Sequence, residues 1–326
     1  MYKGLKTNWQ VTKETFKEFI NDNPLDYAAI IGFYTIFSLP AVLIIVIRIA
    51  GSVFGLDAVR GEVVAQVGGI VGRSSAEQIQ SIIENAWQSD AGTVGTIVGV
   101  ATMIFTATTV FVALQDSINA MWEVKAKPEK GWVKLVMARF LSLAMVVSMG
   151  FLLLVSLSLD VILGLLNNYL KAELSGIAVY VMTVANILLS ILINSLIFAV
   201  IFKVLPDARV KWKNVWIGAV VTAILFAIGK SVLNIYFQHD PLADTYGAAG
   251  SLVLILVWVY YTSIIFLFGA EFTQVYSREH DRGIKPKDNA VKVKVKEIES
   301  ENPEDLEDDA ENEDGETSKN EKPRHL

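Results

Sequence analysis

Cysteine is absent from the 326 residues of the chain, and charged residues make up only 19% of them. Without cysteine the chain has no disulfide framework, no thiolate metal site and no cysteine nucleophile, which excludes zinc-finger and thiol redox functions. Apolar residues make up 53%, and the mean hydropathy is +0.45. A water-soluble domain cannot cover that much apolar surface with polar groups, so the composition indicates a membrane protein.

The usual sequence patterns of catalytic sites are missing as well. The three histidines, His239, His280 and His325, lie far apart, and no Walker A, GxSxG or HExxH pattern occurs. We therefore expect no enzyme activity, no catalytic residues, no metal site and no cofactor.

Long apolar runs take up most of the chain. Each of six stretches is long enough to cross a bilayer as a helix, which takes about 20 residues. Their unbroken strings of Leu, Ile, Val, Phe and Ala fit helices, because barrel strands would show alternating segments of about 10 residues. Pro40 lies within the first stretch and predicts a helix kink there. The predicted fold is all-α, a polytopic membrane domain over residues 27–277 with spans at about 28–51, 92–114, 140–166, 177–205, 215–237 and 247–275.

Positive charge is distributed unevenly between the segments that flank these spans. The N-terminus, the second and fourth loops with their flanks, and the segment after the sixth span hold twenty Lys and Arg, while the alternate loops hold three. Positive residues are retained on the cytoplasmic side, so both termini are predicted to be cytoplasmic. The even number of spans agrees with this orientation.

Two segments outside the spans have helical periodicity. Residues 1–26 predict an amphipathic helix on the cytoplasmic side, with lysines along one edge of its apolar face. This helix either lies in the inner headgroup region or packs on the ends of the bundle. The outer loop, residues 52–91, predicts two short amphipathic helices, which either cover a cavity mouth or lie at the interface.

The C-terminal part changes from basic to acidic. Residues 278–296 contain seven Lys and Arg and no long apolar run, which predicts a basic juxtamembrane segment resting on anionic lipid. Residues 297–326 contain 13 acidic and 3 basic residues, a net charge of −10. A segment of this composition cannot bury enough apolar surface to fold, so we expect a disordered acidic tail that is free to bind a cytoplasmic protein.

Several short motifs follow one another in a recognisable order. They are FYTIFSLP at 33–40, NAMW at 119–122, LPD at 205–207, KWK at 211–213, GA at 218–219, YGAAGS at 246–251, WVY at 258–260 and GAE at 269–271. In order and spacing they resemble the YihY/BrkB family of bacterial inner-membrane proteins, historically labelled ribonuclease BN, over residues 12–282. The resemblance implies a six-helix protein of the bacterial cytoplasmic membrane, in a family whose members are also discussed as transporters.

The nuclease label can be weighed against the residues. Hydrolysis of a phosphodiester usually needs clustered carboxylates or histidines that hold a metal ion and activate water. The scattered histidines and the outer loops poor in Lys and Arg disfavour it. Nucleic acid is therefore not expected as a partner.

Polar residues inside the predicted spans are candidates for function, because placing them in lipid is costly. Asp160 and Lys230 have opposite charges and fall at similar depth in the outer part of the third and fifth spans, so we expect them to pair. The fourth span carries a polar stripe, which either lines a wet cavity or hydrogen-bonds to neighbouring helices. The predicted polar cavity is lined by Asp160, Lys230, Thr183, Asn186, Ser190, Asn194 and Asn234.

A second candidate cluster lies at the inner ends of the spans. Asp116 and Asn119 follow the second span, and Glu271 lies towards the end of the sixth. We expect Glu271 either to pair with Arg278 or Arg139 at the interface, or to cap a cytoplasmic gate.

Three classes of function stay open on these observations. The favoured one is a transporter, exporter or lipid-moving protein that uses a polar intramembrane cavity. The alternative is a non-catalytic membrane scaffold that binds partners through its cytoplasmic tail, and a membrane-associated ribonuclease is the least favoured. Membrane lipids are expected partners, and a GxxxG at residues 95–99 permits packing within one chain or in an oligomer.

Overall fold

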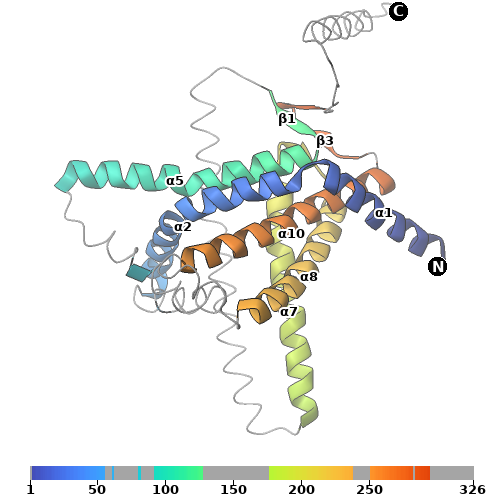
Figure 1. The fold of residues 1–326 in the computed structure, drawn as a ribbon, viewed down its shortest axis with the longest axis horizontal. Coiled ribbons are helices and arrows are strands. Elements are labelled where there is room, and N and C mark those ends of the chain that lie inside the picture. The colour runs from blue at the N-terminus through green and yellow to red at the C-terminus, as the bar shows by residue number, and fades with distance from the viewer. Residues whose placement is uncertain are drawn as a thin grey trace, which may run out of the picture. The chain divides into compact units, whose positions relative to one another are not determined.

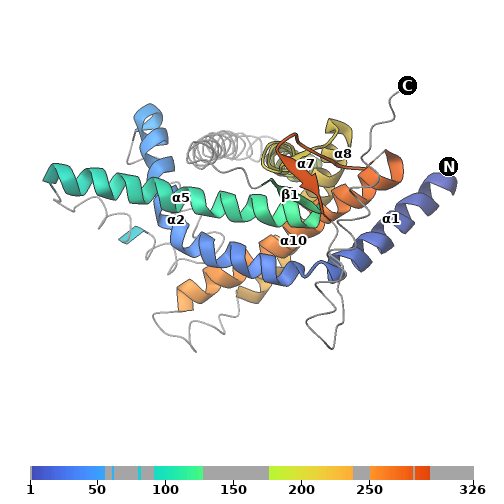
Figure 2. The ribbon, with the colours of Figure 1, turned by 90° about the horizontal axis from the view of Figure 1, so that it is seen from above.

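The structure, a computed structural model, describes residues 2–55, 61, 80–81, 92–127, 176–237, 250–281 and 283–293. Helices make up most of this part of the chain (Figures 1 and 2). They are α1 (Tyr2–Asn21), α2 (Pro24–Phe54), α5 (Gly92–Met121), α7 (Gly176–Val204), α8 (Trp212–Phe237) and α10 (Gly250–His280). The short strands are β1 (Val124–Ala126), β2 (Ala208–Arg209), β3 (Lys285–Pro286) and β4 (Ala290–Lys292).

Five of the described helices are long and apolar enough to cross a membrane. The spans are Pro24–Ile45 in α2, Ala101–Met121 in α5, Ile187–Val204 in α7, Trp212–Leu233 in α8 and Leu252–His280 in α10. They fall on five of the six predicted spans. The predicted span at 140–166, the two helices of the loop at 52–91 and the acidic tail at 297–326 lie outside the described residues, apart from a few positions in the loop.

The chain turns sharply between α1 and α2. Asn23 adopts a left-handed conformation, with φ 48° and ψ 49°, and Pro24 opens α2. Asparagine tolerates this conformation better than most residues, and proline suits a first helical turn because no hydrogen bond needs its missing N–H. Farther along, α2 keeps Pro40 within the helix, and the helix bends along its length in both views (Figures 1 and 2).

Helices α8 and α10 run antiparallel and touch through a reciprocal pair of glycines and threonines. A Cβ atom added to Gly218 would lie 1.8 Å from Oγ1 of Thr273, and one added to Gly269 would lie 1.8 Å from Oγ1 of Thr222. Each threonine hydroxyl donates to the glycine carbonyl one turn earlier in its own helix, at 2.7 Å for Thr222 and 2.8 Å for Thr273. Close contact of this kind stabilises membrane helix pairs, because lipid offers no hydrophobic driving force between helices.

Aromatic side chains fill the space where α7, α8 and α10 meet. Phe198 and Phe202 of α7 lie against Phe266 of α10, with ring centroids 6.2 and 5.2 Å apart. Phe226 of α8 lies between Phe198 and Trp258, at 5.9 and 6.1 Å. These contacts fix the three helices against one another over several turns.

Two small antiparallel sheets join segments that are far apart in the sequence. β4 pairs with β1, with Val124 opposite Lys292, and β3 pairs with β2, with Ala208 opposite Pro286. Both β3 and β4 lie in the segment that the sequence predicted to be a basic stretch on the lipid surface. There, residues 283–293 pair with the chain that follows α5 and α7, and the contact of this segment with lipid stays a prediction. We refer to the ends of the helices that meet these strands as the strand-bearing end (Figure 1).

Helix α1 packs on the C-terminal half of α10. Val11 and Thr15 are buried, and the rings of Phe16 and Phe19 contact Phe268 with centroids 5.0 and 5.3 Å apart. Other apolar side chains of α1 are exposed, with 72% exposure for Trp9. The helix therefore combines packing on the bundle with an exposed apolar face of the kind that lies on a lipid surface.

Candidate functional site

A carboxylate surrounded by amide groups lies at the strand-bearing end. Asp207, between α7 and β2, accepts hydrogen bonds from Gln115 at 3.0 Å, Asn119 at 3.1 Å and Asn289 at 3.2 Å. Its backbone N–H donates to Oδ1 of Asn119 at 2.8 Å, and its carbonyl accepts from the N–H of Lys287 at 2.9 Å. Asp207 thus ties together α5, the start of β2 and the segment between β3 and β4.

Trp122 connects the end of α5 to α10. Its ring is fully buried, and its indole N–H donates to the carbonyl of Ala270 at 2.8 Å. The carbonyl of Trp122 accepts from the ammonium of Lys292 at 2.8 Å, and the same ammonium lies 3.0 Å from Glu123. The NAMW and GAE motifs therefore meet in space, 148 residues apart in the chain.

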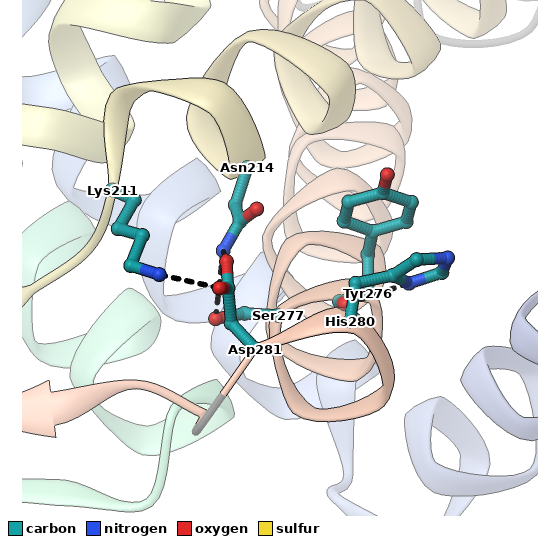
Figure 3. Close-up of polar contacts among 6 residues, drawn as sticks. All are labelled: Lys211, Asn214, Tyr276, Ser277, His280 and Asp281. Carbon is teal, nitrogen blue, oxygen red and sulfur yellow. Dashed lines mark hydrogen bonds and ion pairs between the residues drawn. The ribbon is translucent and has the colours of Figure 1, made fainter.

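A third polar group joins the start of α8 to the end of α10, as Figure 3 shows. The amide of Asn214 donates to Ser277 at 3.0 Å and to Asp281 at 2.8 Å, and Asp281 also forms an ion pair with Lys211. The hydrogen bonds from Lys211 and Asn214 hold the pKa of Asp281 below its usual value. His280 stacks on Tyr276 at 4.1 Å.

Glu271 has a different environment from these paired groups. Its side chain is 0% exposed, and no described donor reaches either carboxylate oxygen. Three residues on, the buried Oε1 of Gln274 also lacks a donor in the described part of the chain. A buried carboxylate without a partner is costly, so the position calls for an explanation.

The neighbours of Glu271 are mostly acidic. Arg278 binds Glu18 through both guanidinium nitrogens, at 3.0 and 2.8 Å, and lies 3.1 Å from Glu14. Asp22 lies just after α1. Burial, with added repulsion from Glu123 and Glu18, raises the pKa of Asp22 to about 6.

The predicted inner cluster is divided in the structure. Asn119 is buried and belongs to the group around Asp207, and Asp116 is exposed near that same carboxylate. Glu271 instead lies close to the carboxyl groups of α1 and of the turn after it. Arg278, one of the two partners expected for Glu271, is bound by Glu14 and Glu18, and Arg139 lies outside the described residues.

The predicted polar cavity is described only in part. Asp160 lies outside the described residues, as do the side chains of Thr183, Asn186 and Asn234. Lys230 and Ser190 are exposed on α8 and α7, and Asn194 donates to the carbonyl of Ser190 at 2.8 Å within its own helix. The pairing of Asp160 with Lys230 stays a prediction.

Asp207 and Glu18 were not predicted as site residues, although Asp207 is part of a motif that the sequence displayed. A proline before an acidic residue at the end of a span is a usable signal for a fixed loop carboxylate. Within the described residues, no group of three or more His, Asp or Glu side chains is placed to hold a metal ion.

Five membrane-length helices, with buried polar groups tied together at one end, define a multi-pass membrane protein. The chain belongs to the family described as virulence factor BrkB, whose profile matches residues 15–294.

Curated bacterial relatives bear the name UPF0761 membrane protein, which places the chain among multi-pass bacterial membrane proteins. One from Pseudoalteromonas atlantica is 24% identical over 249 residues, or 75% of this chain and 78% of the relative. One from an Enterobacter species is 30% identical, and the YihY protein of Salmonella typhimurium is 28% identical, each over 55% of this chain and 58% of the relative. No solved structure matches the chain.

Proposed function

We propose that the protein moves a solute or a lipid across the bacterial membrane. The observation that carries the proposal is Glu271, an acidic residue in a membrane-spanning segment that is fully buried and has no described hydrogen-bond donor. Ionisable residues in such helices are rare, and they usually serve ion or substrate pathways because their burial costs stability. The proposal assigns the protein no catalytic chemistry.

The position of Lys230 supports a polar pathway farther along the helices. This lysine is exposed on α8 in the part of the fold that the structure describes, within a span that crosses the bilayer. An ammonium at that depth needs a counter-charge or water. Asp160 remains the proposed counter-charge, and the hydroxyl and amide groups of α7 are the proposed lining.

The orientation enters the proposal as a prediction from the charge distribution. With both termini in the cytoplasm, the strand-bearing end faces the cytoplasm. Because the chain has no cysteine, single cysteines give a clean labelling test in intact cells with an impermeant thiol reagent. Cysteines at Gln88 and Asp244 should react and one at Glu129 should not, and the opposite pattern would invert the orientation.

Transport can be tested in proteoliposomes with defined probes. A fluorescent phospholipid bleached by external dithionite reports lipid movement, and a trapped pH dye under an imposed potassium gradient reports ion movement. Glu271→Gln and Lys230→Ala should lower the rate towards that of protein-free vesicles. Glu279→Gln, an exposed change on the same helix as Glu271, should leave it unchanged. Equal rates for the wild type and for protein-free vesicles with both probes would count against the proposal.

A scaffold function is the second candidate, because the strands β3 and β4 fix the chain immediately before the acidic tail. The pairing of β4 with β1 holds Lys292 opposite Val124, close to the end of α5. A protein partner recruited by negative charge would then be held close to the membrane. This candidate is favoured if no probe moves while deletion of the tail alone reproduces the cellular phenotype of a gene deletion.

A further inference from the structure

Glu18 and Glu271 are neighbours at the contact between α1 and α10, where Phe19 packs on Phe268 and Glu18 binds Arg278. No described N–H or O–H donor approaches either oxygen of Glu271. Two carboxylates have only acceptor atoms, so they cannot form a hydrogen bond with each other. A hydrogen bond between them requires that one of the two carries a proton.

The charges around the pair also favour a proton on one of the two carboxyl groups. Glu18 and Asp22 face Glu271 with negative charge, and Arg278 of α10 is the facing positive charge in the described part of the chain. The guanidinium of Arg278 binds Glu18 through both terminal nitrogens and also lies 3.1 Å from Glu14. If every group were ionised, four carboxylates would share one guanidinium, and one of the four would be fully out of water.

The two carboxyl groups differ in whether an ion pair or water can compensate a negative charge. Glu18 forms a bidentate pair with Arg278, and its side chain is 28% exposed. Glu271 is 0% exposed and has no ion pair or hydrogen bond with any residue that the structure describes. Like-charged carboxyl groups in contact do not both ionise, and the more deeply buried one keeps the proton, as in paired carboxyl groups of other proteins.

We propose that Glu18 and Glu271 form a proton-binding site, in which the carboxylic acid of Glu271 donates its hydrogen bond to the carboxylate of Glu18. Release of the proton to water at the strand-bearing end leaves two adjacent carboxylates, which repel each other across the α1–α10 contact. Binding of the proton restores the contact. The role of this proton as the coupling ion of transport rests on the proposed function, but the proton site itself does not.

Infrared difference spectroscopy of the purified protein tests the site without any transport measurement. A buried carboxylic acid gives a carbonyl stretch that disappears when the acid ionises, so the wild type should show this band and lose it on titration to alkaline pH. Glu271→Gln should abolish the band. Glu279→Gln, on the exposed face of the same helix, should leave it intact.

A second variant keeps the test valid if Glu271→Gln fails to fold. Glu18→Gln replaces the charged acceptor with a neutral amide and preserves Glu271, so the band should remain but shift in frequency. Absence of the band in the folded wild type would overturn the proposal. So would thermal stabilisation of the wild type by Mg²⁺ or Ca²⁺ that is lost in Glu271→Gln, because it would show that the site holds a metal ion instead.

The same variants separate this inference from the proposed function. A titratable band in a protein that moves neither probe in vesicles supports the proton site and contradicts transport. Transport that is independent of an imposed pH gradient, in a protein without the band, supports transport and contradicts the proton site.

Discussion

The contact between α8 and α10 can be tested by adding a single methyl group at Gly218. In Gly218→Ala the new Cβ would lie 1.8 Å from Oγ1 of Thr273, 3.0 Å from its Cβ and 3.4 Å from the carbonyl oxygen of Gly269. The hydroxyl cannot simply rotate away, because it donates to the carbonyl of Gly269 at 2.8 Å and threonine has few χ1 rotamers in a helix. The helices must therefore move apart or the hydrogen bond must break.

The magnitude follows from the overlap. Inserting a methyl group into a packed core costs about 1–3 kcal/mol, while replacing glycine by alanine in a helix gains up to about 1 kcal/mol in propensity. We expect Gly218→Ala to destabilise the protein by about 1–2 kcal/mol. Gly269→Ala should cost more, because its Cβ would lie 2.8 Å from Cβ and 3.0 Å from Cγ2 of Thr222 in addition to the hydroxyl overlap.

The measurement is the free energy of unfolding in mixed micelles, with thermal aggregation in detergent as a second probe. Gly99→Ala is the matched control, since nothing described lies within 4 Å of the added Cβ, and it should be neutral or stabilising. Thr273→Ala removes the overlapping hydroxyl and should restore most of the stability lost in Gly218→Ala. Equal stability of Gly218→Ala and Gly99→Ala would refute the packing argument.

Three further predictions concern the strand-bearing end. Because the pKa of Asp22 is raised from 3.8 to about 6, ionisation destabilises the fold as the pH rises through that range. Asp22→Asn should therefore stabilise the protein by about 1 kcal/mol at neutral pH, after allowance for partial exposure, and the gain should vanish below pH 4 in a series of thermal melts. Asn119→Ala removes a donor to Asp207 and an acceptor of its N–H, so it should cost about 1–3 kcal/mol in the same assay. Truncation after Lys296 should leave the thermal stability unchanged, whereas truncation after Asp281 removes β3 and β4 and should lower it; equal stabilities would contradict the importance of the strands.

The spans were predictable because their signal is local. Apolar runs at 92–114 and 177–205 predicted helices that the structure places at Gly92–Met121 and Gly176–Val204. Hydropathy does not determine the last turn of a helix, so the extension of α10 to His280, beyond the predicted limit at residue 275, was missed. Two- and three-residue strands such as β2 and β4 have no periodicity that a sequence can display, so the all-α prediction omitted them.

The site was harder to predict because its contacts join residues far apart in the chain. Asn119 and Asp207 were each noted in a motif, but their hydrogen bond spans 88 residues and depends on how α5 and α7 approach each other. Glu271 was noted as an acidic residue near a helix end. Glu271 faces Glu18, and does not pair with Arg278, because of how α1 packs on α10. Charge patterning alone does not determine this packing.

The order of synthesis gives the two small sheets a further consequence. β1 and β2 are made before their partners, and more than 80 residues separate Asp207 from Asn289. While the ribosome is still producing α8 and α10, the chain after α5 and α7 therefore has open strand edges and a carboxylate without its full set of donors. Residues 283–293 complete both at once after all five described spans have been made, so closure of this end reports that the membrane domain has been fully translated.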